Sequence, residues 1–202
     1  SIDAALSANP THVSAYSLIV EQGTKMARMV KSGEVVPADD DVLARRYEMA
    51  DASFRAVGLD WYEVSNWARG GPNGRSVCRH NLGYWRNDDW VGIGPGAHSH
   101  VAGVRWWNHK HPARCSTALS RGELPIAGVE VLSSEVQAME SVMLGVRLAE
   151  GMSLDRVMPG HESDLVELIT EGLIDEEMYS RRRVALTPQG RLLADLVVRR
   201  LT

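Results

Sequence analysis

The first part of the chain shows two patterns of apolar residues, one typical of strands and one typical of an amphipathic helix. Residues 12–20 form a short, β-rich apolar run, which predicts a strand buried on both faces of a parallel sheet. After Asp39 or Asp40, apolar residues recur at three- and four-residue steps until Gly58, which predicts an amphipathic helix. Residues 59–65 return to a strand pattern. In one sheet, this order predicts a right-handed βαβ crossover and an α/β fold.

The last third of the chain has a different pattern. Helical periodicity runs through Val136 to Val146 and again up to Gly172, and residues 173–175 and 183–186 read as a β-hairpin. A last helix follows, with Thr187 as its N-cap and a proline in its first turn. Helix, helix, hairpin, helix is the order of a small α+β winged-helix-like domain. Prolines and glycines interrupt residues 112–131, so we expect a linker there between domains at 1–111 and 132–202.

Composition and charge narrow the classes of partner. The 202 residues are 44% hydrophobic, with a net charge of −4, so a packed core is expected and a general attraction to nucleic acid is not. No apolar run reaches the roughly 20 residues needed to cross a bilayer, and no signal peptide is recognisable, so we expect a cytoplasmic protein. The chain begins Ser1-Ile2-Asp3, which suggests a fragment.

Aromatic and histidine residues concentrate in the middle of the chain. All six tryptophans and five of the seven histidines lie between residues 61 and 111. Within residues 79–85, if these are helical, His80 and Tyr84 share one face, while Asn81 and Trp85 share the adjoining face. Such faces could grip a planar conjugated ligand. His80 is a candidate axial ligand of haem iron, although a structural hydrogen bond is the commoner role of a histidine.

A glycine-rich segment follows at residues 92–100. Glycines at alternate positions allow a ligand such as a nucleotide-like cofactor to approach the backbone, but they also suit a tight turn. The segment is not the dinucleotide fingerprint, because the spacing is GxGxG and Pro95 interrupts it.

Other motifs support weaker alternatives. The HxH pairs at 98–100 and 109–111 would each share one face of a strand and could bind zinc, but no further ligand completes either site. Cys78 and Cys115 lie far apart without CxxC spacing. Arg181 to Arg183 could form a basic wing on DNA, yet residues 130–202 hold eight basic and thirteen acidic residues, which argues against a DNA-binding module.

Five stretches together resemble successive blocks of the radical S-adenosylmethionine (SAM) family that includes the oxygen-independent coproporphyrinogen III oxidases. The blocks are residues 12–18, 61–69, 78–85, 92–99 and 104–108. The resemblance covers essentially the whole chain and implies the C-terminal part of a partial (β/α)6 radical SAM barrel followed by the winged-helix-like domain. The family's CxxxCxxC motif, which holds a 4Fe-4S cluster with SAM on its open iron, does not occur in this chain. The chain alone is therefore expected to be unable to cleave SAM, and whether the protein is an enzyme stays open.

The resemblance also implies site residues and a function. Its SAM adenosine site falls on Ser17, Ile19, Gly94, Gly96, Ala97 and His98. The His-Asn-x-x-Tyr-Trp signature marks the haem-chaperone branch and falls on His80, Asn81, Tyr84 and Trp85, with His80 or Tyr84 as the iron ligand. It implies haem as cargo and delivery to haem-accepting respiratory enzymes, at the membrane surface where these are membrane-bound. The alternative is the oxidase reaction itself, the oxidative decarboxylation of coproporphyrinogen III in haem biosynthesis.

Overall fold

The computed structural model describes all residues from 1 to 202. The chain forms two compact units, residues 1–78 and residues 79–202, and each is described by itself. Contacts therefore divide the chain after Cys78 and not near residue 111, and the predicted linker at 112–131 holds a helix and a strand. The division into domains at 111 and 132 stays a prediction. None of the helices is long and apolar enough to cross a membrane.

The first unit is a three-stranded sheet with helices. Its elements are α1 (Ile2–Leu6), β1 (His12–Ser14), α2 (Lys25–Lys31), α3 (Asp40–Arg55), β2 (Leu59–Glu63), β3 (Asn66–Arg69) and the 3-10 helix η1 (Gly71–Asn73). Helix α3 begins at the predicted cap, because the side chain of Asp39 accepts a hydrogen bond from the amide of Val42 at 2.7 Å. Phe54 of α3 packs with Leu59 and Trp67 of the sheet in one buried cluster. The predicted amphipathic helix is confirmed.

The strand pairing of this unit differs from the prediction. The sheet order is β1-β3-β2, and both outer strands pair with β3 in antiparallel fashion. The order strand, helix, strand is therefore present, but β1 and β2 are not neighbours, because the strand that follows β2 lies between them. The prediction that residues 12–20 form a strand buried on both faces is wrong here. The strand ends at Ser14, and Tyr16, Leu18 and Ile19 are all at least 68% exposed. The reason is pairing: within this chain, β1 is an edge strand that contacts β3 alone.

Buried polar side chains tie the sheet together where β2 turns into β3. Asn66 is fully buried, accepts a hydrogen bond from the Ser14 hydroxyl, and donates to Glu63 and to the Tyr16 hydroxyl. The hydroxyl of Tyr62 bonds with Nε2 of His12 at 2.8 Å and accepts from the amide of Cys78 at 3.2 Å. Burial raises the pKa of Tyr62 to about 12 and lowers the pKa of His12. Burial thus favours the neutral form of both groups.

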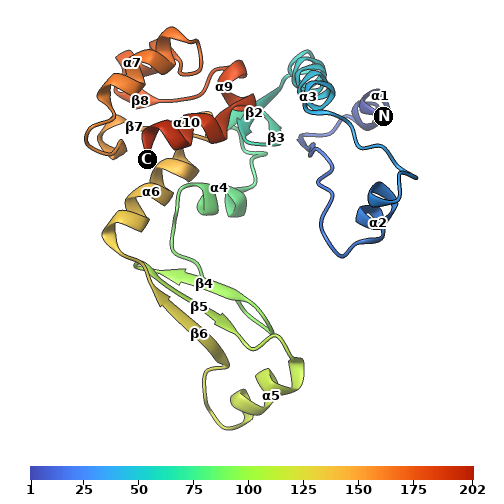
Figure 1. The fold of residues 1–202 in the computed structure, drawn as a ribbon, viewed down its shortest axis with the longest axis vertical. Coiled ribbons are helices and arrows are strands. Elements are labelled where there is room, and N and C mark those ends of the chain that lie inside the picture. Colours follow the sequence, from blue (N-terminus) through green and yellow to red (C-terminus); the bar gives the residue numbers. More distant parts are fainter. The chain divides into compact units, whose positions relative to one another are not determined.

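The second unit begins with α4 and an extended sheet. Its first elements are α4 (Arg79–Trp85), β4 (His98–Val101), β5 (Val104–Asn108), α5 (Pro112–Ser120) and β6 (Ile126–Val131). The sheet order is β4-β5-β6, antiparallel throughout. Figure 1 shows α5 at the end of this sheet that is farther from α6 (Ser134–Gly145). Trp61 and Trp67 belong to the first unit, and the other four tryptophans belong to the second.

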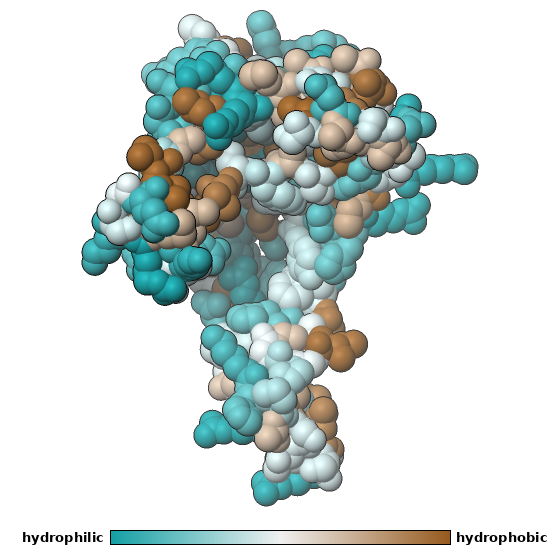
Figure 2. Space-filling view, turned by 90° about the vertical axis from the view of Figure 1, so that its right-hand side faces the viewer, coloured by the Kyte–Doolittle hydropathy of each residue, from teal (hydrophilic) through white to brown (hydrophobic).

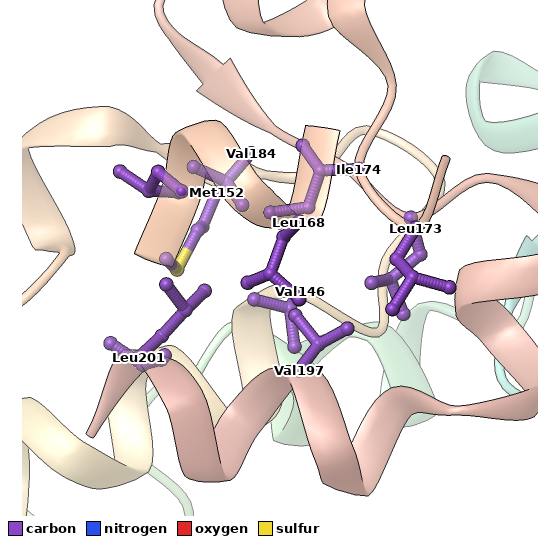
Figure 3. Packing of buried hydrophobic residues seen from close by; sticks show 11 residues of the cluster. Val146, Met152, Leu168, Leu173, Ile174, Val184, Val197 and Leu201 are labelled. Atoms are coloured by element: carbon purple, nitrogen blue, oxygen red, sulfur yellow. The ribbon is translucent and has the colours of Figure 1, made fainter. Parts of the chain in front are cut away.

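The C-terminal part of the second unit has an almost wholly apolar core. The remaining elements are β7 (Met152–Ser153), η2 (Leu154–Arg156), α7 (Glu162–Thr170), α8 (Glu176–Ser180), β8 (Arg183–Val184), α9 (Pro188–Leu192) and α10 (Ala194–Leu201). Val146, which caps the end of α6, Leu168 of α7 and Val197 of α10 are completely buried in this cluster and lie close together, as Figure 3 shows. The element order from α6 is therefore helix, strand, helix, helix, strand, helix, helix, which confirms a small α+β part, while the winged-helix-like arrangement stays a prediction. In the space-filling view, exposed apolar residues form separate patches among hydrophilic ones (Figure 2).

Two details of this part differ from the sequence prediction. The predicted polar turn of the hairpin is helix α8, capped by Asp175, whose side chain accepts from the amide of Met178. Strand β8 pairs with β7, a segment not predicted as a strand, while the expected partner contributes only the isolated bridge between Ile174 and Leu186. The cap at Thr187 is confirmed, because its hydroxyl accepts from the amide of Gly190 at 3.0 Å. The final helix is interrupted at Leu193.

Candidate functional site

The His-Asn-x-x-Tyr-Trp signature lies on helix α4, as the sequence predicted. Its buried residue is Leu82, whereas His80 and Tyr84 are exposed, and Asn81 and Trp85 are half-buried. The guanidinium of Arg86, just after the helix, donates two hydrogen bonds to the carboxylate of Glu150, at 2.9 and 3.1 Å. This bidentate pair raises the pKa of Arg86 and anchors the end of α4 to the segment that follows α6. The end of α4 is thus attached to the rest of the unit by an ion pair, while the rings of His80 and Tyr84 are exposed.

His80 and Tyr84 touch each other on the exposed side of α4. Their ring centroids are 4.7 Å apart with an interplanar angle of 85°, and the Tyr84 hydroxyl lies 3.2 Å from Nε2 of His80. This is the contact expected for residues four apart on a helix. An exposed imidazole beside a phenol offers two of the side-chain types that can ligate haem iron. The donor set therefore fits haem as a bound cargo.

The signature is joined to the sheet by a residue that sequence reasoning missed. Trp90 packs its ring edge-on against Tyr84, with centroids 5.1 Å apart and an angle of 78°. Its backbone exchanges two hydrogen bonds with His100, at 2.8 and 2.9 Å. Trp90 lies outside α4 and follows no helical spacing from Tyr84, so no periodic signal could have paired them. Only its place in the tryptophan-rich segment marked it as unusual.

The glycine-rich segment forms a tight, internally bonded turn. The amide of Gly96 donates to the carbonyl of His109 at 2.9 Å, and the amide of Ala97 donates to the carbonyl of Gly94 at 3.3 Å. Both glycines have positive φ, +105° at Gly94 and +69° at Gly96. The amides of Gly96 and Ala97 are thus engaged within the chain, as a turn requires. Gly94, next to which a side chain would find open space, and the exposed His98 remain available to a ligand.

The other predicted SAM residues, Ser17 and Ile19, lie in the first unit and are both exposed. Gly94, Gly96, Ala97 and His98 belong to the second unit. The structure describes each group within its own unit. Assignment of all six residues to one SAM site stays a proposal.

The two HxH pairs have different surroundings. His98 and His100 share a face of β4, as predicted; His98 stacks on Trp107 at 5.9 Å, and His100 is buried with its Nε2 unpartnered. The second pair does not lie on a strand, because β5 ends before His109 and His111 is the N-cap of α5. His109 and His111 line a cavity of about 550 Å³ with Arg114 and Arg121. No group of three or more His, Cys, Asp or Glu side chains is arranged to hold a metal ion.

The three arginines of the predicted wing are all paired within the chain. Arg181 forms an ion pair with Glu177, and Arg182 forms one with Asp155. The guanidinium of Arg183 donates to the backbone carbonyls of Glu150 and Gly151. Each of the three side chains therefore has a partner within the chain.

Comparison with known proteins adds independent support for the family. The chain is 49% identical over its whole length to "Heme chaperone HemW" of Mycobacterium tuberculosis, and 32% identical over 98% of its length to the protein of that name from Bacillus subtilis. It is 41% identical over 89% of its length to "Radical S-adenosyl methionine domain-containing protein 1, mitochondrial" of Danio rerio. It spans 50%, 52% and 41% of these relatives, respectively. No family model matches the chain.

The fold agrees with the same assignment. The structure matches that of coproporphyrinogen III oxidase (HemN) from Escherichia coli, a radical SAM enzyme, with a TM-score of 0.66 over 99% of this chain and 50% of the other. The sequence identity is 14%, so this match speaks for the fold alone. Its extent is consistent with the predicted C-terminal part of that fold. The chain therefore belongs to the coproporphyrinogen III oxidase-like family of radical SAM proteins, and among its relatives are the proteins named haem chaperone HemW.

Proposed function

We propose that this chain is the haem-binding part of a cytoplasmic haem chaperone that delivers haem to respiratory haem proteins. The observation that carries the proposal is the exposed imidazole of His80, which lies beside Tyr84 on the signature helix α4. Imidazole nitrogen binds haem iron, and exposure allows a cargo to be taken up and passed on. The name carried by the relatives, haem chaperone, points the same way.

Each residue of the signature has a role in this proposal. His80 is the iron ligand, Tyr84 lies against its ring, and the half-buried Asn81 and Trp85 form the adjoining face for the porphyrin. An indole provides a flat apolar surface with one hydrogen-bond donor, which suits a conjugated macrocycle with a polar edge. Tyr84 remains the alternative iron ligand.

We also propose that the full-length protein carries a 4Fe-4S cluster and SAM. Cys78 and Cys115 are the only cysteines here, and they lie in different units, so this chain does not supply the cluster ligands. Within the second unit, the SAM adenosine would contact Gly94, Gly96, Ala97 and His98. Ser17 and Ile19, which belong to the first unit, are the other proposed SAM residues. The open space at Gly94 and the exposure of His98 support part of this assignment. When bound, SAM and the cluster supply radical chemistry, which this chain alone is expected to lack.

An anaerobic haem titration of the full-length protein, followed by absorbance, tests the haem proposal. Wild type should bind haem stoichiometrically, whereas His80→Ala should lose this binding. His109→Ala is a matched control, because it removes another imidazole of the second unit and should leave binding intact. Equal haem affinity of wild type and His80→Ala would remove His80 from the site. Delivery is tested by mixing the haem-loaded protein with a haem-free respiratory haem protein and following the acceptor's spectrum.

The second candidate is an oxygen-independent coproporphyrinogen III oxidase, which the fold match to that enzyme favours. It predicts that the intact protein, supplied with cluster, SAM and coproporphyrinogen III under anaerobic conditions, releases carbon dioxide and forms protoporphyrinogen IX. Product formation without haem binding would replace the chaperone proposal. Haem binding without formation of protoporphyrinogen IX would support the chaperone proposal.

A further inference from the structure

Trp90 contacts Tyr84 of the signature helix and is itself paired with the sheet through its backbone. Its amide donates to the carbonyl of His100, and its own carbonyl accepts from the amide of His100, so its backbone is paired with the edge strand β4. His100 itself is buried. The indole of Trp90 therefore stands on a supported segment of backbone, while Tyr84 and His80 stand on the exposed side of a seven-residue helix.

The three rings contact one another in series: Trp90 contacts Tyr84, and Tyr84 contacts His80. Trp90 meets Tyr84 at 5.1 Å and 78°, and Tyr84 meets His80 at 4.7 Å and 85°. Both are edge-to-face arrangements, which aromatic rings prefer to direct face-to-face stacking. At the end of this series the Tyr84 hydroxyl lies 3.2 Å from Nε2 of His80. The nitrogen that would approach an iron thus already has a hydrogen-bond partner.

We propose that Trp90 is a positioning residue that holds Tyr84 against Nε2 of His80, so that the phenol must move aside before this nitrogen binds a metal. The contact protects an exposed imidazole from incidental ligands and sets the rate at which it becomes available. Only the identity of the metal as haem iron rests on the proposed function. The contacts between the rings of Trp90, Tyr84 and His80 are observed in the structure and do not depend on the proposed function.

The test measures the accessibility of His80 in the full-length protein without haem. Diethyl pyrocarbonate acylates unprotonated imidazole nitrogens, and mass spectrometry gives the rate for each histidine at a fixed pH. One aromatic contact or one exposed hydrogen bond is worth about a two- to tenfold change in such an equilibrium. We expect His80 to react about two- to tenfold faster in Trp90→Ala and in Tyr84→Phe than in wild type.

Two controls separate positioning from a general loss of structure. Trp90→Phe keeps an aromatic ring against Tyr84 and should restore the wild-type rate at His80. The exposed His111 should react at one rate in every variant, and the buried His100 should stay slow. If Trp90→Ala speeds up the reaction of His100 as well, the variant has opened the sheet. In that case the rate at His80 in Tyr84→Phe tests whether the phenol covers Nε2, because this variant removes only the hydroxyl.

An unchanged rate at His80 in Tyr84→Phe, or in a folded Trp90→Ala, would overturn the proposal. A stopped-flow measurement then links it to haem: association should be about two- to tenfold faster in Tyr84→Phe than in wild type. Absence of haem binding in wild type would refute the proposed function while leaving the acylation result to judge the ring contact. Slower haem association in Tyr84→Phe would instead make Tyr84 an iron ligand and overturn its role as a cover.

Discussion

Helix α4 and the C-terminal cluster belong to the same compact unit but use their side chains in opposite ways. In the cluster, Val146, Leu168 and Val197 are completely buried and apolar. On α4, His80 and Tyr84 are exposed, polar and in contact with each other. The cluster explains why the unit folds, and it offers no chemistry. The exposed pair adds little to folding and carries the chemistry on which the proposed function depends.

The largest effect on stability is expected from the cluster. Leu168→Ala removes a completely buried side chain from the centre of the apolar core, so it should lower the free energy of unfolding by about 2–5 kcal/mol. Chemical denaturation followed by circular dichroism measures this change. The exposed residue His80 provides the matched control, because His80→Ala should change stability by less than about 0.5 kcal/mol. A similar loss of unfolding free energy in Leu168→Ala and His80→Ala would contradict the view that the cluster stabilises the fold and the exposed pair does not.

The glycine-rich turn provides a second comparison within one loop. A Cβ at Gly92 would lie 2.0 Å from the carbonyl oxygen of His98, whereas a Cβ at Gly94 would meet nothing within 4 Å. Gly92→Ala should therefore destabilise the protein by about 1–3 kcal/mol or more, because the backbone has to move. Gly94→Ala should cost about 1–2 kcal/mol through its positive φ alone. Hydrogen exchange at the amides of β4 checks the order, and a larger effect at Gly94 would contradict it.

The cap of helix α9 should give a smaller effect. Thr187→Ala removes the hydroxyl that accepts from the amide of Gly190, so the expected loss of stability is about 1 kcal/mol. Thr187→Ser keeps an acceptor at the same place and is the matched control. Thermal unfolding of both variants measures the difference, and equal melting temperatures for the two would show that the cap contributes nothing.

The smallest effect is expected for the pH dependence that His12 adds to the first unit. Burial lowers its pKa below the usual 6.5, so the unfolded chain binds the proton more readily than the folded one. Its contribution is present above pH 6.5 and is lost as the pH falls through the lower folded pKa. Stability measured between pH 5 and 8 should fall less steeply towards acid in His12→Gln than in wild type. Equal slopes would show that His12 does not cause this dependence.

The sequence predicted local features well where one residue decides them. The caps at Asp39 and Thr187 and the shared face of His80 and Tyr84 depend on neighbours within four positions, so spacing alone predicts them. Pairing between distant segments was harder to predict. The place of β3 between β1 and β2, and the pairing of β7 with β8, depend on contacts that no local pattern encodes. The contact of Trp90 with Tyr84 escaped prediction for the same reason.

The most direct test of the account measures haem binding and unfolding in the same preparation of His80→Ala. This variant should lose stoichiometric haem binding in an anaerobic titration and keep the melting temperature of haem-free wild type. Haem affinity equal to that of wild type would contradict the assignment of His80 as the iron ligand. A large fall in melting temperature would contradict the separation between the residues that bind and the residues that hold the fold together.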